Sequence, residues 1–256
     1  MLSDPGRAYM KQNWTSRTEL LLGSENLEKL KNTQITIVGL GGVGSAATEA
    51  LARAGIGKFT LIDYDHINET NLNRQIIALH STIGRLKTEV TRERILDINP
   101  EANVEIYSEF LCLENRMEVL KRSDYIVDAI DSLGPKMGML KDLCSIEKPF
   151  ISVLGAGNRL DPTSIQIVSI WKTQGCPMAK RLKKLLRRYG VTTDFPVVFS
   201  SETPISIDTS PPPDDFSDTN IRPDSIPKTL VGSISYMPSI MGMMAAGKVI
   251  NDIISK

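Results

Sequence analysis

Short apolar runs alternate with amphipathic stretches along residues 34–154. A β-rich run at 34–38 precedes a helical pattern at 43–54, and a second apolar run follows at 58–63. This spacing predicts a β-α-β unit with parallel strands and a right-handed crossover. The alternation continues with strand patterns at 103–107, 124–130 and 149–154 and helical patterns at 85–97, 113–121 and 135–146.

This alternation predicts an α/β fold, in which a Rossmann-like, mostly parallel sheet is flanked by helices on both faces. The pattern changes after residue 155, so we expect a C-terminal α+β extension. It contains a half-exposed strand at 164–170, a basic helix at 178–189 and a Met- and Gly-rich helix at 236–254. The predicted organisation has a helical arm at 1–33, a nucleotide-binding core at 34–160, and a C-terminal region at 161–256 with a mobile loop at 208–227.

The bulk composition argues against several classes of protein. The 256-residue chain carries 30 Lys and Arg against 30 Asp and Glu, so polyanion binding requires a local patch. Three widely spaced cysteines with no CxxC pair argue against a disulfide framework and a structural zinc site. The N-terminus lacks the apolar core of a secretory signal, and Pro238 interrupts the longest apolar stretch. We therefore expect a cytoplasmic protein with no membrane span.

A glycine run follows the first predicted strand and opens the next helix. Glycines allow a tight turn and a close approach to phosphate, and the helix N-terminus adds N–H donors and a favourable dipole. Asp63 ends the next strand, 19 residues after Gly44, where an acid binds ribose hydroxyls. The motif indicates a nucleotide but does not separate NAD from ATP. Its glycines are Gly39, Gly41, Gly42 and Gly44.

A polar cluster after the second strand favours a triphosphate. A dinucleotide fold does not need such a cluster, whereas a triphosphate needs Arg and Lys to neutralise its charge and amides to hold its oxygens. Asp131 follows the strand pattern at 124–130, where a carboxylate suits a magnesium ion that bridges phosphates. The cluster comprises Asp65, Asn71, Asn73, Arg74, Gln75 and Lys87.

Together these motifs resemble the ubiquitin-activating-enzyme-like superfamily of adenylating enzymes, whose bacterial members include MoeB and ThiF. The similarity extends from about residue 17 to the C-terminus. It implies an ATP-binding core at 34–160, magnesium, and a homodimer in which an arginine crosses into the partner's site. Arg17 matches that arginine, and its assignment rests on the resemblance alone. The catalytic set implied in this way is Arg17, Arg74, Lys87 and Asp131.

Within the superfamily, the chain looks most like the tRNA threonylcarbamoyladenosine dehydratases. Segments 131–136, 155–163 and 198–202 carry this resemblance, and the paired CxxC zinc ligands of MoeB-like members are missing. Some dehydratases have a cysteine just before the Val-Phe-Ser segment, but this chain has Pro196-Val197, which excludes a thioester at that position. The resemblance leaves open a monovalent cation and a sulfur-transfer partner protein.

The basic helix predicts a tRNA-binding surface in the C-terminal region, which would also supply substrate and dimer contacts. Six of the nine residues 180–188 are Lys or Arg, and Leu182, Leu185 and Leu186 share one helical face. The remaining surface suits a phosphate backbone, although a solvated helix at a subunit contact has the same pattern. The predicted tRNA contacts are Lys180, Arg181, Lys183, Lys184, Arg187 and Arg188.

The resemblance predicts ATP-dependent adenylation of the threonyl carboxylate of tRNA threonylcarbamoyladenosine, followed by cyclising dehydration. The protein then acts by positioning and charge neutralisation, because an intramolecular ring closure needs no protein nucleophile. Three alternatives stay open. The first is adenylation of the C-terminus of a ubiquitin-like sulfur-carrier protein, as in MoeB and ThiF. The others are an NAD-dependent oxidoreductase, which the polar cluster disfavours, and a non-catalytic nucleotide- or tRNA-binding module.

Overall fold

A single mixed sheet organises the computed structural model, which describes residues 13–109, 113–207 and 231–255. The strands are β1 (Gln34–Val38), β2 (Lys58–Ile62), β3 (Asn103–Tyr107), β4 (Tyr125–Asp128), β5 (Phe150–Val153), β6 (Ile165–Ser169) and β7 (Pro196–Ser200). Within the described ranges their order is β3-β2-β1-β4-β5-β7-β6. Neighbouring strands are parallel except β6 and β7, which pair antiparallel at one edge. The mobile loop predicted at 208–227 lies outside the described residues.

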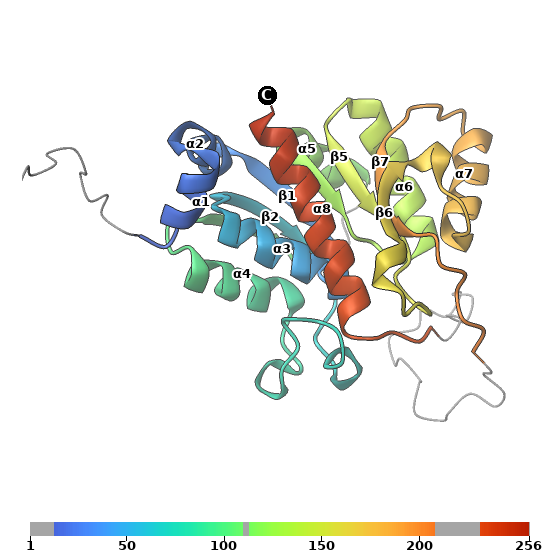
Figure 1. Ribbon diagram of the computed structural model, residues 1–256, viewed down its shortest axis with the longest axis horizontal. Helices are drawn as coiled ribbons and strands as arrows, with labels where there is room; N and C mark the ends of the chain where they lie inside the picture. The colour runs from blue at the N-terminus through green and yellow to red at the C-terminus, as the bar shows by residue number, and fades with distance from the viewer. Residues whose placement is uncertain (1–12, 110–112, 208–230, 256) are drawn as a thin grey trace, which may run out of the picture.

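Helices cover both faces of the sheet (Figure 1). They are α1 (Ser16–Leu22), α2 (Ser24–Asn32), α3 (Gly42–Ala54), α4 (Lys87–Ile98), α5 (Leu113–Arg122), α6 (Leu133–Ile146), α7 (Pro177–Arg188) and α8 (Tyr236–Ile254), with short 3-10 turns η1 (Glu69–Asn71), η2 (His80–Thr82), η3 (Pro162–Ser164) and η4 (Ile170–Lys172). Strand side chains alternate between the faces, so that Tyr125 and Val127 pack into one core and Ile126 into the other. Helices α2, α3, α4 and α8 contribute to the first core, and α5, α6 and α7 to the second.

The α/β alternation predicted from the sequence is confirmed, with small differences at the boundaries. Helix α4 begins at Lys87 rather than at residue 85, because Leu86 forms a bridge with His66. Strand β4 ends at Asp128, whose carboxylate accepts a hydrogen bond from Ile130 N (3.1 Å) and turns the chain there. Helix α1 lies within the predicted helical arm at 1–33, whereas β7 was not predicted.

The C-terminal region belongs to the same sheet as residues 34–160. Strands β6 and β7 extend the sheet, while α7 and α8 pack on opposite faces. Helix α8 runs beside α3 (Figure 1), and a Cβ on Gly242 would lie 2.3 Å from the carbonyl oxygen of Val43. Met237 and Met241 are fully buried on α8. Among the helices of the described ranges, none has the length and apolar character needed to cross a bilayer.

The strand order reverses beside β1, which fixes where a ligand can bind. The chain passes from β1 to β2 and β3 on one side, and then returns to β4 and β5 on the other. Ligands in open α/β sheets bind at the carboxyl ends of the strands where the order reverses. Val38 and Asp128 end β1 and β4 and lie in register. The candidate site is therefore at this point of the sheet.

Candidate functional site

The loop between β1 and α3 has a backbone that requires glycine. Gly39 has a φ of +89°, and a Cβ there would lie 2.8 Å from the carbonyl oxygen of Ala129. A Cβ on Gly44 would lie 1.8 Å from the carbonyl oxygen of Gly39, so the loop touches the first turn of α3. Gly41 caps α3, and among the described residues a Cβ there would meet only the Gln75 Nε2 atom, at 3.9 Å. The start of α3 is thus sterically open at Gly41, where a phosphate would approach the helix N-terminus.

The predicted polar cluster packs directly against this loop. A Cβ on Gly42 would lie 3.1 Å from the carbonyl oxygen of Arg74, so the 71–75 segment and the glycine loop form one wall. Gln75 is only 6% exposed, and its Oε1 has no hydrogen-bond partner within the described part of the chain. Buried polar atoms are normally satisfied, so this orphaned amide oxygen fits a ligand that donates a hydrogen bond.

Asp63 is bound to the glycine loop itself. Its Oδ2 accepts a hydrogen bond from Leu40 N (2.6 Å), and its Oδ1 accepts one from Asp65 N (2.8 Å). Burial raises the pKa of Asp63, and the positive charge of Lys87 and these two hydrogen bonds only partly offset burial. The strand end therefore presents a half-buried carboxyl beside the loop, where the sequence predicts a ribose contact.

Lys87 begins α4 and points back to the end of β2. The side chain is 7% exposed, and Nζ lies 2.7 Å from Asp65 Oδ2. The Asp65 side chain is half exposed, so this ion pair has one solvated partner. Lys87 therefore lies at the predicted site, where its ion pair with the Asp65 carboxylate fixes its position. Its contact with a phosphate stays a prediction.

Arg74 and Asp131 are close enough for their charges to interact. Arg74 Nη1 donates to Thr70 O (2.8 Å) and to Asn73 Oδ1 (3.0 Å). Burial lowers the pKa of Arg74, and the negative charge of Asp131 opposes that shift. Asp131 is exposed and accepts a hydrogen bond from Ser132 Oγ (3.0 Å). The segments that follow β2 and β4 therefore bring a cation and a solvated carboxylate near each other.

One exposed carboxylate is an appropriate protein ligand for nucleotide-bound magnesium. The described residues contain no group of three or more His, Cys, Asp and Glu that could enclose a metal ion. Magnesium usually keeps several waters and binds through one or two carboxylates plus substrate phosphates. Asp131 fits that pattern, because it lies beside the glycine loop rather than in a closed cage.

Two predicted amides form hydrogen bonds with other parts of the protein. Asn71 Oδ1 accepts a hydrogen bond from Asn68 N (3.3 Å) and closes its own 3-10 turn. Asn73 Nδ2 donates to Ser233 O (3.0 Å), which ties the loop to the segment before α8. These bonds hold the polar cluster in place, and direct phosphate contacts by Asn71 and Asn73 stay predictions.

Sequence reasoning missed a buried ion pair beneath Asp131. Lys136 and Asp128 are both fully buried, and Lys136 Nζ lies 2.7 Å from Asp128 Oδ2, which also accepts a hydrogen bond from Ser152 Oγ (2.7 Å). Burial lowers the pKa of Lys136, while the charges of Asp128 and Asp131 oppose it. The sequence signal for this pair was Lys136 itself, a lysine that directly precedes the apolar residues of α6 that begin with Met137. The pair fixes the turn after β4 that presents Asp131.

Arg17 does not reach the site of its own chain. It is exposed on α1, and the preceding Thr15 lies near Gly55, at the carboxyl end of α3. The glycine loop is at the other end of this 13-residue helix, which spans about 20 Å. Leu20 and Leu21 on α1 are 75% and 83% exposed. Arg17 therefore extends from an apolar surface that is remote from the nucleotide loop of the same protomer.

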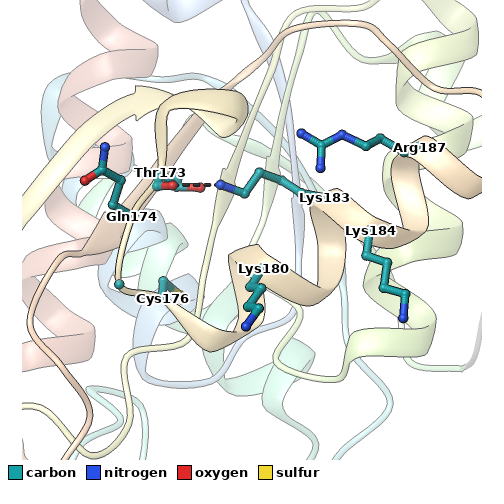
Figure 2. Close-up of a pocket in the computed structure, with 8 residues that line it drawn as sticks. Thr173, Gln174, Cys176, Lys180, Lys183, Lys184 and Arg187 are labelled. Carbon is teal, nitrogen blue, oxygen red and sulfur yellow. Dashed lines mark hydrogen bonds between the residues drawn. The ribbon is translucent and has the colours of Figure 1, made fainter.

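The basic helix α7 forms one wall of a cavity of about 410 Å³ (Figure 2). Leu182 and Leu186 are fully buried and Leu185 is half-buried, which confirms the predicted apolar face. Four of the six predicted tRNA contacts line the cavity, whereas Arg181 and Arg188 do not. The four are Lys180, Lys183, Lys184 and Arg187.

Both cysteines of the described ranges are at least partly buried. Cys176, at the start of α7, is 4% exposed. Burial raises the pKa of the Cys144 thiol to about 11, so it stays protonated at neutral pH. Both described cysteines are free. Burial therefore limits access to Cys176, and Cys144 lacks the thiolate form that a nucleophile needs.

Comparison with known proteins agrees with this geometry. A model described as the ThiF family matches residues 15–256. The tRNA threonylcarbamoyladenosine dehydratase of Bacillus subtilis is 39% identical over 241 residues, which cover 93% of this chain and 94% of that protein. The Escherichia coli protein of the same description is 40% identical over 199 residues, or 76% of this chain and 72% of the relative.

Solved structures give the same relationship. The crystal structure of E. coli tRNA N6-threonylcarbamoyladenosine dehydratase, TcdA, in complex with AMP matches with a TM-score of 0.82 at 32% identity, over 97% of this chain and 98% of that one. The complex of that protein with ATP matches with a TM-score of 0.81, over 94% and 93% of the two chains. From these matches and the geometry of the glycine loop, the chain belongs to the ThiF family, in its tRNA threonylcarbamoyladenosine dehydratase branch.

Proposed function

We propose that this protein is an ATP-dependent tRNA threonylcarbamoyladenosine dehydratase. The observation that carries the proposal is the convergence of the glycine loop, Gln75, Lys87, Arg74 and Asp131 where the strand order reverses. The proposal is supported by a match that covers 93% of this chain to a relative of that name, and by a match over 94% of this chain to a structure in complex with ATP. The reaction converts the open threonylcarbamoyl nucleoside of tRNA to its cyclic form.

The chain's own groups neutralise and position the triphosphate. The N–H groups at the start of α3 and the open space at Gly41 receive phosphate oxygens. Arg74 and Lys87 oppose the negative charge, and Asp63 accepts hydrogen bonds from the ribose hydroxyls. Asp131 would hold magnesium, which neutralises phosphate charge and orients the phosphates when bound. No proton transfer is required of these groups in the first step.

Adenylation makes the carboxylate reactive. The threonyl carboxylate oxygen attacks the α-phosphorus of ATP, a new P–O bond forms, and pyrophosphate leaves with the electrons of the broken bond. A free carboxylate is a poor acyl donor because oxide is a very poor leaving group, whereas AMP is a good one. Arg74 and Lys87 stabilise the charge that develops on pyrophosphate, which is the main role for fixed cations in such a step.

Ring closure then occurs within the substrate. The neighbouring carbamoyl group attacks the activated carbonyl carbon, the bond to AMP breaks, and the carbamoyl group loses a proton, so that the net change is loss of water. Because nucleophile and acyl group belong to one nucleoside, correct orientation can supply roughly 7–11 kcal/mol of the barrier. A protein nucleophile is unnecessary, consistent with the buried Cys176 and the Pro196-Val197 sequence.

The proposed active enzyme is a homodimer in which each site is formed by residues of both protomers. A tRNA substrate agrees with a location in the cytoplasm. Arg17 lies far from its own glycine loop and beside exposed Leu20 and Leu21. An apolar surface of this kind favours an interface, and a twofold axis would carry each Arg17 to the partner's site. Arg17 then adds a cation to the phosphates bound by the other protomer.

Pyrophosphate release with tRNA as substrate tests the activity. The tRNA is purified from cells without a dehydratase, so that it carries the open nucleoside, and the product is identified by mass spectrometry. Wild-type protein should release pyrophosphate and form the cyclic nucleoside. Asp131→Ala should lose both while it retains tRNA affinity. Asp97→Ala removes another exposed carboxylate, on α4, and should behave as wild type.

The outcomes separate the alternatives. Wild-type turnover by Asp131→Ala would refute the role of Asp131 in holding magnesium. Pyrophosphate exchange that requires a carrier protein and ignores tRNA would assign the enzyme to carrier adenylation. Binding of ATP without turnover on any substrate would indicate a non-catalytic module, and a change in NADH fluorescence on binding would favour an oxidoreductase.

Mixing two inactive variants tests the composite site. Arg17→Ala and Asp131→Ala each disable one half of a shared site. After random reassortment, about a quarter of the sites combine an intact Arg17 with an intact Asp131, so activity returns. If Arg17 acts within its own protomer, the mixture stays inactive, and the crossing arginine is refuted.

A further inference from the structure

Arg159 is a buried arginine in the loop that follows β5. The residue is 4% exposed, whereas Leu160 beside it is 50% exposed, so the guanidinium lies just beneath the surface. Nη1 donates to the carbonyl oxygens of Gly155 (2.5 Å) and Gly157 (3.3 Å), and Nε donates to that of Glu202 (3.4 Å). These three acceptors are neutral. They fix the guanidinium in position without compensating its charge.

Arg159 differs from the other buried basic residues in its lack of a carboxylate partner. Lys87, Arg116 and Lys136 are also buried, and each forms an ion pair with an aspartate. No Asp or Glu side chain in the described ranges forms an ion pair with Arg159. A buried charge is costly unless it is paired. A ligand with a negative charge would supply the missing partner.

One nitrogen of the same guanidinium also lacks a hydrogen-bond partner. Within the part of the chain that the structure describes, the buried side-chain atoms without such a partner are Arg159 Nη2 and Gln75 Oε1. Buried polar atoms are normally satisfied, so an orphaned donor indicates a missing acceptor. Gln75 lies beside Gly41, just after β1, and Arg159 contacts Gly155, just after β5. Both orphaned atoms therefore belong to side chains at the carboxyl edge of the sheet.

The order of the strands places Arg159 beyond Asp131, on the side opposite the predicted ribose contact. The carboxyl ends of β2, β1, β4, β5 and β7 follow one another along this edge. Asp63 follows β2, the glycine loop follows β1, and Asp131 follows β4. Arg159 binds carbonyls that follow β5 and β7. Since the nucleotide would occupy the β2 and β1 positions, the position next to β5 is left for the acid that ATP activates.

We propose that Arg159 binds the threonyl carboxylate of the substrate and orients it for attack on the α-phosphorus of ATP. This inference rests on the proposed function and adds a residue to its site. Nη2 donates to one carboxylate oxygen, and the other oxygen stays free to form the bond to phosphorus. A carboxylate supplies both the acceptor and the negative charge that Arg159 lacks, whereas an ester supplies only an acceptor.

Binding of two synthetic RNA hairpins, measured without ATP, tests this role. One hairpin carries the open nucleoside with a free threonyl carboxylate, and the other carries its methyl ester. Wild type should bind the acid about tenfold or more tightly than the ester, because the acid forms a charge-assisted hydrogen bond. Arg159→Gln should lose this preference and bind the ester as wild type does. The control Arg122→Gln removes an exposed arginine just before the amino end of β4, and should keep the preference.

A purely structural role for Arg159 predicts a different result. If Arg159 only connects the loops after β5 and β7, Arg159→Gln should weaken binding of acid and ester equally, and the proposal is overturned. If thermal melts show that Arg159→Gln does not fold, wild type provides the test. Its ratio of ester Kd to acid Kd should hold from roughly 0.1 to 0.3 M salt, because a buried pair is screened little. A ratio that falls to one, equal affinities at all salt concentrations, or no binding of either hairpin would overturn the proposal.

The experiment separates this inference from the proposed function. If wild type prefers the acid through Arg159 but forms no cyclic nucleoside with ATP, the proposed function fails and the carboxylate contact stands. If wild type forms the cyclic nucleoside and Arg159→Gln keeps the wild-type preference, the proposed function stands and the assignment of Arg159 fails. ATP affinity should be the same in wild type and Arg159→Gln, because Arg159 is not part of the glycine loop.

Discussion

Replacing Lys136 by methionine should destabilise the fold strongly although it preserves the length of the side chain. Lys136 and Asp128 are fully buried, with 2.7 Å between Nζ and Oδ2. The variant leaves the Asp128 carboxylate inside the protein with hydrogen bonds only from Ser152 Oγ and Ile130 N. Removal of one partner from such a pair costs about 3–5 kcal/mol. For a chain of this size, that loss lowers Tm by roughly 6–20 °C.

Reversible urea unfolding followed by circular dichroism measures this loss. The matched control is Asp128→Asn/Lys136→Met, which removes both charges and keeps an acceptor for the hydroxyl of Ser152. The double variant should recover most of the lost free energy of unfolding, because its core contains no unpaired charge. A loss below about 1 kcal/mol in Lys136→Met would refute the reasoning. Equal losses in the single and double variants would assign the effect to packing of the lysine stem.

The remaining predictions concern the glycine loop and two carboxylates. Gly44→Ala should unfold or severely destabilise the protein, since its Cβ would lie 1.8 Å from a backbone oxygen, whereas Gly41→Ala should keep the wild-type Tm and lose ATP affinity. Thermal melts and binding of a fluorescent ATP analogue distinguish the two variants. Equal Tm values for both variants would contradict the steric argument. Binding of the same analogue should weaken as pH falls through the raised pKa of Asp63, because a protonated carboxyl accepts fewer hydrogen bonds from ribose. Asp63→Asn should bind the analogue weakly, with an affinity that does not change with pH. A wild-type pH dependence in that variant would exclude the ribose contact. Burial raises the pKa of Glu49, but the hydrogen bonds and charges of Arg94 and Arg53 outweigh burial, so its pKa lies below the ordinary 4.5. Its contribution to stability is present above that value and lost as pH falls through the lowered pKa, so the difference in urea midpoint between wild type and Glu49→Gln should shrink in acid.

The parts of the site that the sequence predicts are those with local patterns. The glycine run is contiguous, and the strand and helix around it have clear periods, so the turn at Gly39 and the start of α3 are where the pattern places them. Asp63 and Lys87 follow or begin regular elements and therefore also lie at the carboxyl edge of the sheet. In parallel α/β folds, topology alone brings such residues together.

The parts that the sequence does not predict depend on partners distant in the chain. Ser152 meets Asp128 across 24 positions, and Lys87 meets Asp65 across 22. A spacing of residue types does not specify which oxygen a lysine will contact. For the same reason the basic pattern of α7 could not separate Lys184 from Arg181, because the cavity wall depends on the 173–176 segment.

Strand β7 was missed for a related reason. Its residues 196–200 follow no alternating polar pattern, because four of the five are buried between helices and neighbouring strands. Continuous apolar runs of this length do not distinguish a buried strand from a short helical segment. Only its pairing with β5 and β6 settles the assignment.

The contact between α8 and α3 has a consequence for biosynthesis. Helix α8 covers α3, with a close approach of the backbones at Gly242 and Val43. While the ribosome is still translating the middle of the message, the face of α3 that later receives α8 has no cover. Chains elongate at roughly 5–20 residues per second, so the uncovered face persists for many seconds. The nascent protein therefore presents a hydrophobic surface to chaperones until α8 emerges.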